Sequence, residues 1–391
     1  MDKTKLEFQT GKVLSISGAH FVHDLFSSFL ALFLPLLINK FGLSMALAGS
    51  FTVFVRIPSV LNPLFGIISD RVNICYLAIW APALTAVTMS LLGVAQSYAM
   101  VCVLLLVAGT SAAVFHVIGP VMIARVSGAN LGRGMSFWQT GGELARTVGP
   151  LLAVWAVSMW EFDGSYPVMI IGILASIFLH IKLKNVIPVI GSVKQHKNGN
   201  LLEIWRSLRR VMIPLAGIMV SSAFMGGTLT AFLPTYLVAG GKSLWFGGAG
   251  LAVLELSGAM GALLGGTISD RIGRHAVLLI AIPTSSILML ALIYAPEWAA
   301  LPILAFLGCS LFAATPVKLA IVQDNSKDCR GAANGLYMGI SFLITASVTV
   351  FVGWMADILG LRMAFTVSAL LGLAGTPIVF FLPKNKKQAG C

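Results

Sequence analysis

The sequence predicts an all-α integral membrane protein with about twelve transmembrane helices. Hydrophobic residues make up 58% of the 391 residues and charged residues 10%, whereas soluble domains carry about 25% charged residues. Apolar runs of about 20 residues, the length that crosses the hydrocarbon core as a helix, recur along the chain. Lysine and arginine gather in alternate breaks between these runs, as in cytoplasmic loops of membrane proteins. These observations exclude a soluble fold.

The first six expected spans each end where polar or charged residues interrupt an apolar run. They lie near 13–38, 47–69, 74–95, 98–123, 134–159 and 166–186. The residues that interrupt the runs are, in order, Asn39-Lys40, Asp70-Arg71, Gln96-Ser97, Arg125, Glu161 with Asp163, and Lys182 with Lys184.

The last six expected spans follow the same rule. They lie near 211–238, 246–269, 275–295, 299–323, 332–356 and 361–382. The interruptions after them are Lys242, Asp270-Arg271, Glu297, Asp324 with Lys327, Asp357 and Lys384.

The distribution of charge predicts the topology. The net charge is +12, with 26 Lys and Arg. If both termini are cytoplasmic, most of these cations fall on inner loops and tails, which implies an even number of spans. Basicity then reflects contact with anionic headgroups, and no nucleic-acid partner is expected. We expect a multi-pass protein of a bacterial inner membrane with both termini in the cytoplasm.

The chain divides into two halves that echo each other. A polar stretch separates a six-helix bundle at 1–186 from a second bundle at 211–391, with a basic cytoplasmic linker at 187–210. Ser-Asp-Arg ends the second span of each half, at 69–71 and again at 269–271. A duplicated design with its site between pseudo-symmetric halves is common in secondary transporters.

Polar side chains in the first two spans indicate a functional site. His20, His23 and Asp24 lie midway along the first apolar run, and Arg56 lies midway along the second. A charge at the bilayer centre costs roughly 3 kcal/mol on insertion scales, so such residues usually face a wet cavity. We interpret Asp24 with His20, one helical turn earlier, as a proton-coupling site. Arg56 is interpreted as its counter-ion or an anchor for anionic substrate; a structural ion pair is the alternative.

Further polar residues lie inside later spans. Glu143 and Arg146 form an i,i+3 pair that either satisfies itself or faces a cavity. Glu255 is a candidate second proton carrier or a ligand for cationic substrate. Lys318 either binds an anion or extends to the inner headgroups, and His116 is either a packing residue or a functional one. Our candidate sets are therefore Asp24, His20, Glu143 and Glu255 for proton coupling, and Arg56, His23, Arg146, His116 and Lys318 for substrate.

Charged residues at the inner ends of spans are candidates for gating. Carboxylates and guanidinium groups there can pair with each other and with helix termini. The members are Asp70, Arg71, Asp270, Arg271 and Arg274.

The motif Gly266–Arg274, Gly-x-x-x-Asp-Arg-x-Gly-Arg, resembles the inner-loop motif of major facilitator superfamily transporters. The first copy is degenerate, with Asn73 and Ile74 in place of Gly and Arg. A second resemblance, to the fosmidomycin resistance branch of efflux pumps, covers at least the first five spans. It is carried by Ala19-His20 with Asp24, Pro35-Leu36-Leu37, Pro63 with Gly66, Val114-Phe115-His116, Gly141-Gly142 and Gly149-Pro150-Leu151-Leu152. The resemblance implies the two-bundle fold of that superfamily and export by alternating access.

The resulting expectation is a proton-coupled antiporter that exports a small organic drug or metabolite, with anionic compounds among the candidates, and that acts as a monomer. The same groups would serve a proton symporter that imports an organic anion. A divalent metal transporter is a third alternative, because His20, His23 and Asp24 are plausible ligands. No phosphate loop, HExxH or GxSxG motif occurs, so neither an enzyme nor a cofactor site is expected. The five cysteines show no C-x-x-C spacing, so no metal cofactor is expected from them.

Overall fold

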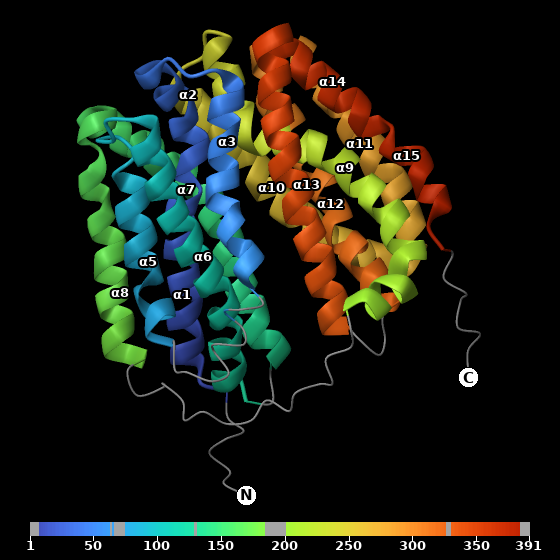
Figure 1. Cartoon of the computed structure of the whole chain (residues 1–391), viewed down its shortest axis with the longest axis horizontal. Coiled ribbons are helices and arrows are strands. Elements are labelled where there is room, and N and C mark those ends of the chain that lie inside the picture. The colour runs from blue at the N-terminus through green and yellow to red at the C-terminus, as the bar shows by residue number, and fades with distance from the viewer. Residues whose placement is uncertain are drawn as a thin grey trace, which may run out of the picture. The chain divides into compact units, whose positions relative to one another are not determined.

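The protein was analysed as a computed structural model. The structure describes residues 8–62, 65, 75–128, 131–183, 201–325 and 330–383. Over these residues the secondary structure consists of helices joined by short turns (Figure 1). The all-α membrane fold expected from composition is thereby confirmed.

The helices up to residue 183 correspond to the expected spans, and most of the end of the span expected at 47–69 lies outside the described residues. The helices are α1 (Thr10–Ser27), α2 (Phe29–Phe41), α3 (Met45–Arg56), the 3₁₀ helix η2 (Ile57–Leu61), α5 (Cys75–Ser90), α6 (Tyr98–Val126), α7 (Leu131–Gly164), η3 (Tyr166–Met169) and α8 (Ile170–Leu183).

The helices from residue 201 onward complete the set. They are α9 (Leu201–Ala239), α10 (Leu244–Ile272), α11 (Arg274–Tyr294), α12 (Glu297–Asp324), α13 (Arg330–Leu359), α14 (Leu361–Leu373), α15 (Gly375–Ile378) and η4 (Val379–Phe381).

Twelve of these segments correspond to the twelve expected spans. In the described part of the chain, nine are long and apolar enough to cross a membrane, counting Thr10–Phe41 as one, and Met45–Leu61 and Tyr76–Ser90 are shorter apolar helices. The twelfth, α7, has 34 residues, but Glu143 and Arg146 in its middle lower its hydropathy. The number of spans predicted from apolar runs is therefore confirmed.

Two helical boundaries differ from expectation. The first span is interrupted at Ser28, between α1 and α2, where the Ser28 hydroxyl donates to the Leu25 carbonyl at 2.7 Å. Such back-bonding competes with the regular helical ladder and bends helices. The helix that contains the seventh span, α9, begins at Leu201 rather than near 211, so the apolar and basic segment before Val211 continues directly into the spanning helix.

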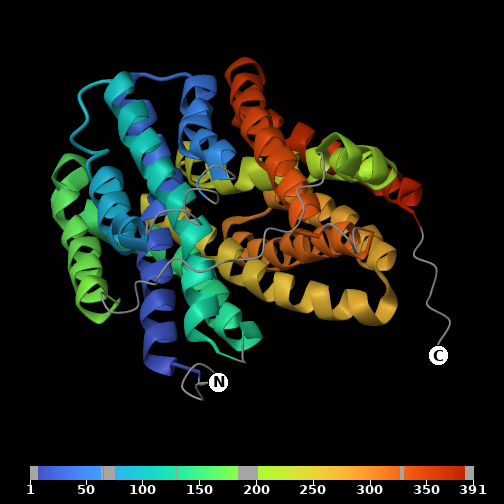
Figure 2. The same ribbon diagram turned by 60° about the horizontal axis from the view of Figure 1, so that its bottom comes forward.

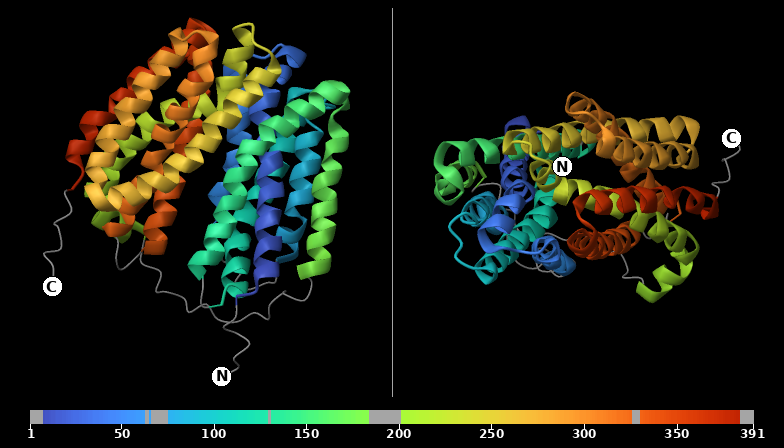
Figure 3. Two further views of the ribbon diagram at one scale, coloured as in Figure 1. Left: turned by 180° about the vertical axis from the view of Figure 1, so that it is seen from behind. Right: turned by 90° about the horizontal axis from the view of Figure 1, so that it is seen from above.

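The chain forms two compact units. The first consists of residues 1–195 together with 231–252, which form the end of α9 and the beginning of α10. The second consists of residues 196–230 and 253–391. In the first unit α1 packs against α7, and α5 packs against α6 and α8 (Figures 2 and 3). In the second unit α11 packs against α12 and α14.

Glycine lets α1 and α7 approach closely, which positions the site described below. A Cβ atom on Gly141 would lie 2.5 Å from the Ser17 carbonyl oxygen, and one on Gly149 would lie 2.5 Å from the Leu25 carbonyl oxygen. Both neighbours are backbone atoms, so a side chain at either position would separate the helices. Small residues allow this kind of backbone contact between membrane helices.

Candidate functional site

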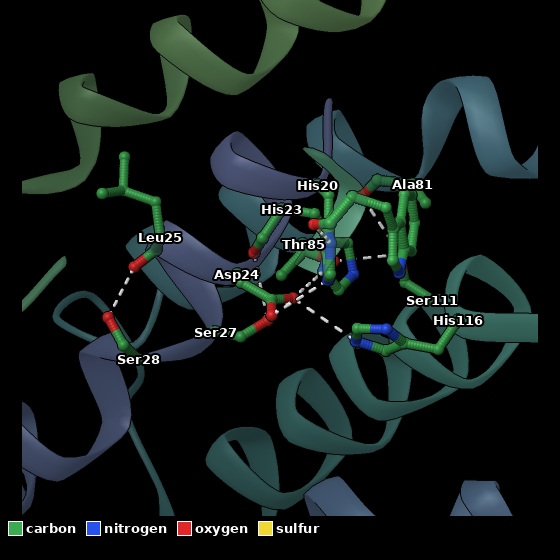
Figure 4. A network of polar contacts seen from close by, with 11 residues as sticks. His20, His23, Asp24, Leu25, Ser27, Ser28, Ala81, Thr85, Ser111 and His116 are labelled. Atoms are coloured by element: carbon green, nitrogen blue, oxygen red, sulfur yellow. Dashed lines mark hydrogen bonds and ion pairs between the residues drawn. The ribbon is translucent and has the colours of Figure 1, made fainter. Parts of the chain in front are cut away.

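Asp24 lies at the centre of a group of three histidines in the first unit (Figure 4). Two of them, His20 and His23, share α1 with Asp24, and His116 comes from α6. Asp24 is 7% exposed, His20 4% and His23 0%. We call these four residues the carboxylate–histidine cluster. Because a buried carboxylate without partners would be costly, the imidazoles account for its stable placement.

His20 is held by α7 on two sides. Its Nδ1 donates to the backbone carbonyl oxygen of Trp138 at 2.7 Å, and its ring stacks on the Trp138 indole with centroids 3.8 Å apart. Its Nε2 faces Asp24 Oδ2 at 3.3 Å. Because a carbonyl oxygen only accepts, Nδ1 carries a proton, and in neutral His20 the Nε2 atom is then an acceptor.

His23 supports the other carboxylate oxygen. Its Nδ1 donates to Asp24 Oδ1 at 2.9 Å, and its ring stacks on Phe115 with centroids 4.5 Å apart. Among the residues that the structure describes, the buried Nε2 atoms of His23 and of His20 have no hydrogen-bond partner. His23, which the sequence suggested as a substrate contact, is enclosed beside Asp24.

His116 is the member of the cluster that reaches the surface of the protein. Its Nε2 lies 3.3 Å from Asp24 Oδ1, while its side chain is 42% exposed. On α6 it lies roughly opposite Val103 and Val107, apolar residues exposed on the same helix. An exposed imidazole away from that apolar stripe is typical of a face that meets water rather than lipid. His116 therefore links the buried carboxylate to the exterior of the unit.

Gly142 on α7 completes the enclosure. A Cβ atom here would lie 2.7 Å from His20 Cε1, 2.9 Å from His20 Nε2 and 3.1 Å from Asp24 Oδ2. The absence of a side chain at this position therefore lets α7 pack directly on the cluster.

A proton or a metal ion between its acceptors would satisfy the cluster. Neutral His20 would place a lone pair 3.3 Å from a carboxylate oxygen, a contact between two acceptors. A proton on His20 Nε2 converts the contact into a charge-assisted hydrogen bond, and a metal ion would also satisfy it. Donor atoms of His20, Asp24 and His116 lie within 4.8 Å of one another, a set that could hold a metal ion.

The Glu143–Arg146 pair is formed on α7, as the i,i+3 spacing suggested. Arg146 donates to Glu143 Oε2, and the Gln139 amide donates to Glu143 Oε1 at 2.9 Å. Both charged side chains are half-buried, at 39% and 23% exposure for Arg146 and Glu143. Arg56, half-buried at the end of α3, lies near enough to Arg146 to interact with it electrostatically. In the described part of the chain Asp24 pairs with the three histidines.

The second unit contributes a buried carboxylate and a buried amine. Glu255 on α10 is 8% exposed, and Lys318 on α12 is 7% exposed. Lys318 is therefore enclosed by protein instead of lying open at the headgroup level.

Among the candidate gating residues, Arg274 has defined contacts. Its Nε lies 3.4 Å from Asp324 Oδ2, and its Nη1 donates to the Ser269 hydroxyl. It thereby ties the start of α11 to the ends of α10 and α12. Arg271 is exposed. Asp70, Arg71 and the side chain of Asp270 lie outside the part of the chain that the structure describes.

Sequence reasoning missed the role of Trp138, whose carbonyl and ring orient His20. It had noted Phe115 and Gly142 as parts of motifs without assigning them a contact. A signal was present: Trp138 and Gly142 are four residues apart and share a helical face. Which helix that face meets is not a local property.

The chain is similar in sequence to proteins of two bacteria. The chain is 25% identical over 395 residues to the fosmidomycin resistance protein of Escherichia coli K12, covering 98% of this chain and 96% of the relative. It is 26% identical over 391 residues to the uncharacterized MFS-type transporter YfnC of Bacillus subtilis 168, covering 96% and 93%. Both alignments span nearly the whole of each chain.

Solved structures with the same fold include three transporters. A bacterial homologue of the human lysosomal transporter Spinster, inward-facing and unoccupied, has a TM-score of 0.78 at 16% identity, covering 97% of each chain. The D-xylose-proton symporter gives 0.74 at 17% identity, covering 97% and 98%, and the nucleoside transporter NupG gives 0.72 at 15% identity, covering 94% and 98%. The family model of the Major Facilitator Superfamily matches residues 16–349. This multi-pass membrane protein therefore belongs to the Major Facilitator Superfamily, whose members are transporters of small molecules and not enzymes.

Proposed function

We propose that this transporter is a proton-coupled antiporter of the bacterial inner membrane that exports a small organic compound by alternating access. The observation that carries the proposal is the carboxylate–histidine cluster. Asp24 is buried within a spanning helix and contacts three imidazoles. Charged groups are rarely placed there without a function, and chains of Asp and His are used as proton relays in pumps.

The cluster is suited to exchange one proton with water. His116 is half-exposed and contacts Asp24 directly, while His20 and Asp24 are enclosed by α7. A proton that enters at His116 can move to the carboxylate over 3.3 Å and from there to His20 Nε2. Imidazole changes charge near physiological pH, which makes it an effective proton carrier.

Cationic side chains within the spanning segments are proposed to recognise the substrate. Arg56 and Arg146 in the first unit, and Lys318 in the second, offer positive charge within spanning segments. Glu143 holds Arg146 in place and is a further candidate for coupling, as is Glu255. An anionic group on the substrate would be recognised bidentately by arginine. Gating is proposed for Asp70, Arg71, Asp270, Arg271 and Arg274 at the inner ends of the spans, with both termini in the cytoplasm.

Export is favoured over import by one comparison. A relative aligned over nearly the whole chain is named for resistance to fosmidomycin, a function that removal of the drug from the cell would explain. The alternative is proton symport of an organic anion, consistent with the D-xylose-proton symporter among the solved structures of the same fold. Both use the same coupling residues.

Transport into proteoliposomes under an imposed pH gradient tests the proposal. Wild-type protein should transport fosmidomycin or a related anion only when the gradient is present, and the sign of the effective gradient separates antiport from symport. Asp24→Asn should abolish gradient-driven accumulation and retain substrate exchange without a gradient, because the amide keeps the size of the side chain and removes its proton.

Asp163→Asn is the matched control, since Asp163 is 71% exposed and lies far along α7 from the cluster. It should transport as wild type does. Gradient-driven accumulation by Asp24→Asn at the wild-type rate would disprove the coupling role of the cluster.

A further inference from the structure

The carboxylate–histidine cluster has the geometry of a metal site with three protein ligands. His20 Nε2 lies 3.3 Å from Asp24 Oδ2, and His116 Nε2 lies 3.3 Å from Asp24 Oδ1. In a tetrahedral zinc site with bonds of about 2.0–2.1 Å, two ligand atoms lie about 3.3–3.4 Å apart. Each of the two distances has the length of a ligand–ligand edge in such a site, and the two edges end on different oxygens of the same carboxylate.

The orientation of the imidazoles supports this reading. Metal-bound histidine usually donates its other ring nitrogen to a carbonyl or carboxylate, which directs the free lone pair to the metal. His20 does so: Nδ1 donates to the Trp138 carbonyl at 2.7 Å, and the buried Nε2 has no hydrogen-bond partner within the described ranges of the chain. His23 in turn orients the Asp24 carboxylate, because its Nδ1 donates to Asp24 Oδ1 at 2.9 Å.

We propose that His20, Asp24 and His116 bind a divalent transition-metal ion of the Zn²⁺ type, and that this ion blocks proton-driven transport by occupying the coupling site. Two imidazole nitrogens and one carboxylate favour Zn²⁺, Co²⁺ or Ni²⁺ over Mg²⁺ and Ca²⁺, which prefer oxygen ligands. Three protein ligands leave a fourth tetrahedral position open, as in zinc sites that keep a water.

The inference deepens the proposed function, because it places a second cation at the same residues, but it rests on different evidence. The sequence suggested His20, His23 and Asp24, all from one helix, as plausible ligands. The structure supplies a ligand from α6: the donor atoms of His20, Asp24 and His116 all lie within 4.8 Å of one another.

Metal binding by the full-length protein in detergent is the direct test. Co²⁺ should give the visible absorption bands of a tetrahedral complex, and Zn²⁺ should displace it and bind at one site in calorimetry. His116→Gln should weaken Zn²⁺ affinity by about 10-fold or more, since one ligand is lost. His116 is half-exposed, so this substitution leaves no buried cavity.

His180→Gln is the matched control. His180 lies on α8 against the rings of Tyr76 and Trp80, outside the cluster, so this variant should bind Zn²⁺ as wild type does. Mg²⁺ should neither bind nor displace Co²⁺. Absence of a saturable Zn²⁺ site in wild type, or equal affinity in wild type and His116→Gln, would overturn the proposal.

The transport measurement separates this inference from the proposed function. Zn²⁺ added at the concentration that saturates the site should stop gradient-driven transport by wild type and by His180→Gln. If Zn²⁺ binds nowhere but Asp24→Asn still loses coupling, the metal site is disproved and the proton site stands. If Zn²⁺ binds at the cluster without slowing transport, the blocking role is disproved.

Discussion

Gly142→Ala tests how closely α7 must approach the carboxylate–histidine cluster. The new Cβ would lie 2.7 Å from His20 Cε1, whereas ordinary van der Waals contact begins at 3.4 Å. The imidazole would have to move by about 0.7 Å. It cannot tilt away freely, because Nδ1 is bonded to the Trp138 carbonyl and the ring is stacked on the indole. Overpacking of this kind costs about 1–3 kcal/mol, or about 5- to 150-fold in an equilibrium constant.

We therefore expect Gly142→Ala to reduce gradient-driven transport in proteoliposomes about 10-fold or more while exchange without a gradient is largely kept. Gly18→Ala on α1 is the control, since a Cβ there meets nothing within 4 Å. The unfolding temperature of both variants in detergent separates loss of coupling from loss of fold. Wild-type coupling in a folded Gly142→Ala protein would refute the packing argument.

The remaining predictions concern stability and are measured by denaturant or thermal unfolding in detergent. Lys40→Met should destabilise the protein by about 1–2 kcal/mol more than Asp163→Asn, because Lys40 also donates to the Gly93 carbonyl. The ion pair of Lys40 with the 71% exposed Asp163 is worth under about 1 kcal/mol. Equal losses in the two variants would mean that the carbonyl contact contributes nothing. Thr228→Val should lower the free energy of unfolding by about 1–3 kcal/mol, because the buried Ser368 hydroxyl loses the Thr228 hydroxyl that donates to it at 3.0 Å. An unchanged unfolding midpoint would contradict that assignment.

The spans could be predicted from the sequence because hydropathy is a local property. The apolar run from Leu244 to Ser269 is long enough to cross a membrane whatever it packs against. The interruption of the first span at Ser28 was harder to predict, because it depends on a hydroxyl that turns back to the Leu25 carbonyl. A serine in an apolar helix does not by itself show which acceptor it takes.

The candidate site was predicted in part. His20 and Asp24 were paired by their spacing of one helical turn, and the structure places them 3.3 Å apart. Arg56 was expected to be either a counter-ion of Asp24 or an anchor for anionic substrate, and that stays a prediction; the partners of Asp24 among the described residues are His20, His23 and His116. Trp138 lies 118 residues from His20 in the sequence, a separation that no local pattern spans.

Sequence alone determined that this chain is an integral membrane protein and how often it crosses the bilayer. It also determined that a carboxylate and two imidazoles lie about midway along the first apolar run. Tertiary structure decided which groups surround that carboxylate. Glycines at 141, 142 and 149 bring α7 against α1, and that contact directs the Trp138 carbonyl to His20, while α6 brings His116 to Asp24. The reason is physical: burial of apolar surface depends on composition along each helix, whereas hydrogen-bond geometry depends on where neighbouring helices come to rest.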